Sequence, residues 1–139
     1  MSTARGVSFT KVLVGLALLA WPGRVLGTMD VQSQGGVSFV SGGVGDEERQ
    51  ALQAMSKRFD LKLTMALTDG TFISDVGVRI LDAHGKAVLD TTSNGPLLYA
   101  QLAPGTYTVK CVLNGKQIER AVRIGTDTQQ HLVFTWAAE

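Results

Sequence analysis

Residues 106–122 read TYTVKCVLNGKQIERAV, and this stretch predicts a β-hairpin. In its first arm apolar residues alternate with polar ones, which is the pattern of a strand with one buried face. Asn114-Gly115 favours a two-residue type I′ turn, because both central positions of that turn need positive φ. Counting outward from the turn pairs Cys111 with Ile118, Val109 with Arg120 and Tyr107 with Val122. Arg120 interrupts an otherwise apolar face, so either a bulge shifts the register or its guanidinium reaches the sheet edge.

Five further stretches have the composition and length of strands. They are residues 61–67, 76–80, 87–92, 98–102 and 132–136, and turn residues stand between most of them. Ala103-Pro104-Gly105-Thr106, for example, fits a type II turn. Together with the two arms of the hairpin these stretches predict an all-β fold of seven strands. We expect a sandwich of two antiparallel sheets, with a closed barrel as the alternative.

The chain ahead of residue 60 predicts a different organisation. Residues 28–45 are rich in Gly, Ser and Gln, so we interpret them as a flexible lead-in with at most one short edge strand. Residues 46–59 predict one short amphipathic helix, since three acids open the segment, two bases stand near its end, and Leu52, Met55 and Phe59 share a face. Residues 60–139 then form the sandwich domain.

Residues 1–27 have the three parts of a secretory signal peptide. Arg5 and Lys11 provide the positive start, and an apolar run over residues 12–21 follows, about half the length that spans a bilayer. Small residues then favour cleavage between Gly27 and Thr28. We therefore expect a periplasmic or secreted protein that is not inserted in the membrane after cleavage; the alternative is an uncleaved anchor.

Charge and cysteine content exclude several classes of function. Removal of residues 1–27 takes away three of the thirteen basic residues and none of the twelve acidic ones, which leaves a formal charge of −2. Nucleic acid is therefore not an expected partner, because it calls for a basic patch. Cys111 is the only cysteine, so an intramolecular disulfide is impossible, and its strand position favours a buried thiol over an intermolecular bridge. His84 and His131 are expected at the surface, and we predict neither metal nor cofactor.

Four stretches of the chain resemble the carboxypeptidase regulatory-like domain. They are residues 75–80, 82–86, 92–96 and above all 102–109, which read LAPGTYTV. The resemblance covers roughly residues 60–136 and implies a transthyretin-like (prealbumin-like), Ig-like sandwich with a non-catalytic role. The signal peptide, the Ser-Gly-Gly-Val-Gly stretch at residues 41–45 and the acidic start of the helix are also similar to short stand-alone secreted proteins of Gram-negative bacteria, which implies a periplasmic location.

These observations favour a binding module over an enzyme. We expect a non-catalytic sandwich that binds a protein, peptide or glycan through loops or an unpaired sheet edge. The candidate contact residues are Phe72, in a loop, and Tyr99, which alternation turns away from the core. One alternative is a small transthyretin-type hydrolase, although the chain lacks that family's closing Tyr-Arg-Gly-Ser. Another is a structural component of an envelope or secretion assembly. The oligomeric state stays open.

Overall fold

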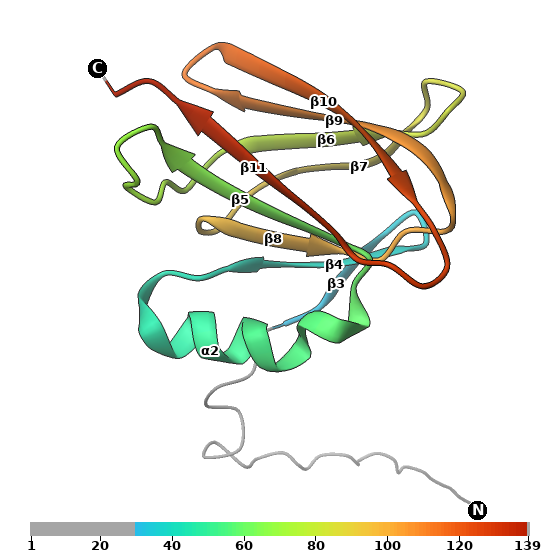
Figure 1. Cartoon of the computed structure of the whole chain (residues 1–139), viewed down its shortest axis with the longest axis horizontal. Coiled ribbons are helices and arrows are strands. Elements are labelled where there is room, and N and C mark those ends of the chain that lie inside the picture. Colours follow the sequence, from blue (N-terminus) through green and yellow to red (C-terminus); the bar gives the residue numbers. More distant parts are fainter. Residues whose placement is uncertain (1–29, 139) are drawn as a thin grey trace, which may run out of the picture.

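The computed structural model describes residues 30–138, which form two packed β-sheets and one short helix (Figure 1). The four-stranded sheet has the order β10-β9-β6-β7, with bounds Lys116–Ile124, Gly105–Leu113, Gly77–Leu81 and Ala87–Thr92. The five-stranded sheet has the order β11-β5-β8-β4-β3, with bounds Gln130–Trp136, Leu61–Leu67, Leu97–Ala100, Val37–Gly42 and Gln32–Gln34. Helix α2 spans Gly45–Met55 and the 3-10 turn η2 spans Ser56–Arg58. The predicted signal peptide and its cleavage site at Gly27 and Thr28 lie outside the described residues.

The core lies between the sheets, as the alternating strands require. Inward side chains from both sheets are buried in one cluster, among them Leu63, Met65, Ile80, Val109 and Phe134. Cys111 and Trp136 belong to this cluster, at 0% and 4% exposure. Both therefore occupy the inward positions that alternation predicts.

The central hairpin has the predicted register. Cys111 pairs with Ile118, Val109 with Arg120 and Tyr107 with Val122. Asn114 and Gly115 have φ of 50° and 80°, as a type I′ turn requires. The pairing runs without a shift past Arg120, whose guanidinium carbon lies 5.5 Å from the Phe134 ring centroid. The structure therefore supports the second possibility for Arg120, in which its guanidinium reaches the edge of the sheet, and not a bulge.

The predicted count of seven strands is wrong, because residues 30–138 alone form nine. The seven predicted strands are present, and residues 32–42 add β3 and β4 to the five-stranded sheet. Ser41 in β4 binds the neighbouring segment: its hydroxyl donates to the Leu97 carbonyl at 3.0 Å and accepts from the Asn94 amide at 2.9 Å. The Gly-rich and Ser-rich composition that suggested a flexible lead-in thus belongs to a paired strand, and the sheet begins before the helix.

The expectation of purely antiparallel sheets is also wrong, because β11 pairs parallel with β5. After β10 the chain crosses from one sheet to the other and enters β11 beside the start of β5, where the Gln130 amide donates to the Asp60 carbonyl. Two strands that start at the same end of a sheet run parallel.

Residues 103–107 form a corner between the sheets. Gly105 has a φ of 156°, far from the value of about 80° that a type II turn needs, so the predicted type II turn is wrong. The Tyr107 hydroxyl donates instead to the Ala103 carbonyl at 2.7 Å. This bond holds the chain as it enters β9, in the manner of the tyrosine corner of Ig-like sandwiches.

Candidate functional site

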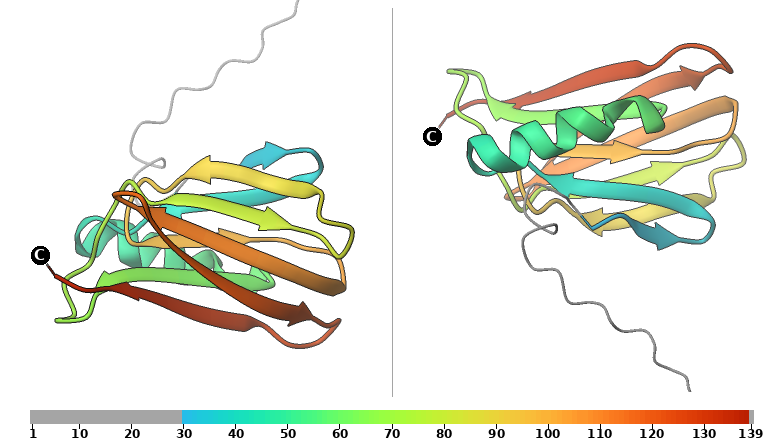
Figure 2. Two further views of the ribbon diagram at one scale, coloured as in Figure 1. Left: turned by 90° about the horizontal axis from the view of Figure 1, so that it is seen from above. Right: turned by 90° about the horizontal axis from the view of Figure 1, so that it is seen from below.

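Tyr99 is not the exposed contact residue that the sequence suggested. Its side chain does point to the outer face of the five-stranded sheet, but α2 lies over that face (Figure 2). Tyr99 is 5% exposed and packs with Val40, Leu52 and Phe59, its ring centroid 6.0 Å from that of Phe59. Alternation along a strand reports which face a residue is on, whereas the helix decides whether that face meets solvent.

Phe72 is exposed, as expected for a contact residue. It lies in the loop between β5 and β6 and leaves 51% of its surface accessible. An isolated antiparallel bridge to Ala66 fixes its backbone, and the Arg49 guanidinium carbon lies 5.8 Å from its ring centroid. Phe72 is thus an aromatic side chain held at the surface by a short sheet extension and by α2.

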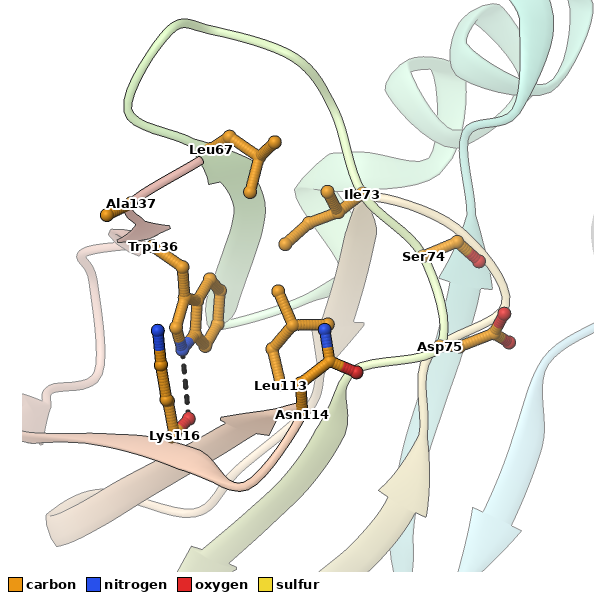
Figure 3. A pocket seen from close by; sticks show the side chains of 9 residues that line it. All are labelled: Leu67, Ile73, Ser74, Asp75, Leu113, Asn114, Lys116, Trp136 and Ala137. Carbon is orange, nitrogen blue, oxygen red and sulfur yellow. Dashed lines mark hydrogen bonds between the residues drawn. The ribbon is translucent and has the colours of Figure 1, made fainter. Parts of the chain in front are cut away.

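The same loop lines a pocket at one end of the sandwich (Figure 3). The pocket has a volume of about 370 Å³ and opens where β5, β9 and β11 end. Its apolar walls are Leu67, Ile73, Leu113 and Trp136, whose side chains converge in Figure 3. The parallel pairing of β11 with β5 sets Trp136 directly beside Leu67, so tertiary topology brings the walls together.

A single hydrogen bond fixes the aromatic wall. The Trp136 indole N–H donates to the Lys116 carbonyl at 2.9 Å, which ties the end of β11 to the tip of the β9–β10 hairpin. Because the bond joins the two sheets at the mouth, it holds the indole in one orientation.

Polar groups surround the mouth. Ser74, Asp75 and Asn114 stand among the lining residues, and Asp75 and Asn114 are exposed. Asp75 adopts a left-handed φ of 60°, which is strained for a side chain larger than glycine, and its amide donates to the Ser93 carbonyl. The pocket therefore combines an apolar interior with hydrogen-bonding groups at its rim, the usual make-up of a binding site.

The groups most suited to catalysis lie elsewhere or are unreactive. Burial raises the pKa of the Cys111 thiol to about 12, so it stays protonated at neutral pH. His131 shares a hydrogen bond of 2.9 Å with the Thr64 hydroxyl, on the outer face of the five-stranded sheet. Burial, helped by the positive charge of Lys62, lowers the His131 pKa, whereas the imidazole of a catalytic triad is ordinarily oriented by a carboxylate that stabilises its protonated form. Within residues 30–138 no three His, Cys, Asp or Glu side chains gather as metal ligands.

A second, smaller pocket of about 220 Å³ lies between η2 and the 125–129 loop. The Gln129 side-chain amide donates there to the carbonyls of Ser56 and Phe59, at 2.7 and 2.8 Å. These bonds hold the end of the helical segment against the loop that leads into β11. We therefore assign this pocket a structural role, in which Gln129 joins the helical segment to the loop.

The pocket at the strand ends was missed from the sequence. Alternation along their strands places Leu67, Leu113 and Trp136 on inward faces, yet no local pattern indicates that the three strand ends meet at one end of the fold. The sequence feature that could have indicated the pocket is that Leu67, Leu113 and Trp136 are each the last inward residue of a strand, where fewer neighbouring side chains fill the core.

A scan of protein-family models and a search of curated proteins both find no match to this chain. Within the described part of the chain, no helix is long and apolar enough to cross a membrane.

Proposed function

We propose that the protein is a non-catalytic, periplasmic or secreted binding module that takes an apolar side chain of a protein or peptide partner into the pocket at the strand ends. The observation that carries the proposal is the pocket itself: four apolar walls, an indole held by a hydrogen bond, and a polar rim. Its volume of about 370 Å³ is near the small end of ligand sites and suits a single large side chain.

The polar rim favours a polypeptide as the ligand. A bound segment has backbone N–H and C=O groups that need partners when they leave water, and Ser74, Asp75 and Asn114 carry such partners at the mouth. A glycan is the alternative ligand; a sugar ring would stack on the exposed Phe72, since Trp136 is only 4% exposed. Phe72, which precedes the lining residue Ile73 in the chain, adds an exposed aromatic side chain on the same loop.

The finer assignments rest on sequence patterns together with the corner at Tyr107. The resemblance of residues 102–109 to the carboxypeptidase regulatory-like domain, with its transthyretin-like sandwich, is supported by the Tyr107 to Ala103 hydrogen bond, which is typical of Ig-like folds. The signal-like residues 1–27 support export. A role inside an envelope assembly is compatible with the same pocket. A transthyretin-type hydrolase is disfavoured, because the hydroxyl–imidazole pair found within residues 30–138, Thr64 with His131, lies beside Lys62 and away from the pocket.

The test is a peptide selection on the wild-type protein, followed by affinity measurements on two variants in which an alanine is replaced by phenylalanine. Ala137→Phe places a ring at the pocket wall, whereas Ala138→Phe adds the same ring at the next exposed residue, which is not part of the lining. We expect selected peptides to share one large apolar residue, to keep their affinity for Ala138→Phe, and to bind Ala137→Phe about tenfold or more weakly. Failure to select any peptide, or equal loss in both variants, would contradict the proposal.

A further inference from the structure

Four strands lie at the edges of the two sheets, and three of these edges are protected. β10 carries four charged side chains, which discourage pairing with another strand. β3 is three residues long, too short to template a neighbour. On β7 the Gln34 side-chain amide accepts from the Asp90 amide at 2.7 Å and donates to the Asp90 carbonyl at 3.1 Å, so it pairs with the edge as a peptide group would.

β11 is the exception. Its seven residues, QHLVFTW, contain no charged residue and no proline, and its pairing with β5 runs without a register shift. Both views in Figure 2 show β11 along the outside of the sheet, with no further element beyond it among the described residues. A long, regular, uncharged edge is the feature that soluble proteins otherwise avoid.

The hydrogen bonding of β11 leaves one set of backbone groups facing outward. The Gln130 amide and the Trp136 carbonyl bond to the chain of β5, at 2.9 and 2.8 Å. Because the backbone groups of successive residues point to opposite sides of a strand, His131, Val133 and Thr135 direct theirs to the free edge. The side chains of these three residues lie on the outer face, and Val133 is 44% exposed.

These groups match a second copy of themselves. We propose that two copies of the chain pair antiparallel along β11, with a two-fold axis at Val133. In this register His131 faces Thr135, Val133 faces Val133, and each facing pair exchanges two backbone hydrogen bonds. Leu132 then faces Phe134 on the inner side, where the Arg120 guanidinium of each copy lies over its own Phe134 ring; β11 itself carries no charge, so the paired strands set no like charges of their own against each other. The arrangement uses every outward-facing backbone group of β11 and closes on itself, as a two-fold interface does.

The dimer joins the two five-stranded sheets into one continuous sheet. Since the paired strands run in opposite directions, the two pockets lie at opposite ends of the assembly. Cys111 is fully buried, so the link is non-covalent and insensitive to reducing agents. The inference does not depend on the proposed function, because it uses the strand edge and not the pocket.

The test measures the mass of the protein in solution by light scattering over about a hundredfold range of concentration. The protein is produced from the full chain, and the variants are Val133→Lys, Val133→Glu and, as a matched control, Val31→Lys. Val31 is similarly exposed, at 38%, but stands beside β3 at the far edge of the same sheet. Circular dichroism checks that each variant is folded.

We expect a dimer for the wild type and for Val31→Lys, with or without reductant. Each Val133 variant sets two like charges against each other at the axis, so dimerisation should weaken about tenfold or more. Mixing Val133→Lys with Val133→Glu should restore a dimer, since unlike charges then meet. A monomeric wild type, a Val133→Lys dimer as stable as wild type, or a mixture that stays monomeric would each overturn the proposal; a monomeric wild type would leave the edge for a strand of a different protein.

Discussion

Replacement of Tyr99 by alanine tests the contact between α2 and the sheet. The ring is 5% exposed and fills the layer between helix and sheet with Leu52 and Phe59. Loss of a buried aromatic ring costs about 3–5 kcal/mol through lost burial and the cavity left behind. Because this layer lies near the surface and can partly collapse, we expect about 3 kcal/mol for Tyr99→Ala, and a fall in Tm of roughly 10–15 °C for a domain of this size.

The assay is urea unfolding followed by circular dichroism, with two companion variants. Tyr99→Phe keeps the ring and should stay within about 0.5 kcal/mol of the wild type. Phe72→Ala removes a ring that is 51% exposed and should cost less than about 1 kcal/mol. Hydrogen exchange adds a local readout: the amides of α2 should exchange faster in Tyr99→Ala, since a helix of eleven residues is marginal without its packing.

A cost of less than about 1 kcal/mol for Tyr99→Ala would show that α2 does not cover the ring. A larger loss of stability in Phe72→Ala than in Tyr99→Ala would refute the same contact. In that case Tyr99 would return as a surface contact, and Phe72 would belong to the core.

Three further variants address the corner, the thiol and a close backbone contact. Tyr107→Phe removes the hydroxyl that donates to Ala103 and should cost about 1–2 kcal/mol in urea unfolding; no change would show that the bond is not formed. The folded-state pKa of Cys111, about 12, lies above its ordinary value of 9.0, so the folded state holds this proton more tightly; the stabilisation is complete below pH 9 and is lost as the pH rises towards 12. Cys111→Ala should therefore show a shallower fall of stability above pH 9 than the wild type, and parallel curves would refute the shift. Gly95→Ala should cost about 2–4 kcal/mol, because a Cβ there would lie 2.3 Å from a backbone oxygen of β4. Gly77→Ala, whose nearest such contact is 3.8 Å, is the control and should be within about 1 kcal/mol of neutral.

Local chemistry was sufficient for the centre of the fold. Asn114-Gly115 admits one tight turn, and a two-residue turn leaves one register, so the pairing of Cys111 with Ile118 follows from the sequence. The period of two then places Cys111 and Trp136 inside. The acids at residues 46–48 likewise mark the start of a helix, and there Glu48 accepts hydrogen bonds from the amides of Gly43 and Val44.

Contacts between segments far apart in the sequence could not be predicted from local chemistry. β3 and β4 have the composition of a loop, and become strands because β8 offers β4 a partner about sixty residues further along the chain. Side-chain alternation is the same in parallel and antiparallel strands, so it could not predict the parallel pairing of β11 with β5. That pairing in turn brings Trp136 to Leu67 and builds the pocket.

The sequence by itself determined where most strands run, which side of each is apolar, and how the central hairpin is aligned, because these depend on residues within a few positions of one another. The tertiary structure alone decided that Tyr99 is covered by α2, that three strand ends meet in a pocket, and that β11 is left as an open edge. Each of these depends on which segment lies beside another, and that is decided by the packing of the whole chain and not by any local pattern.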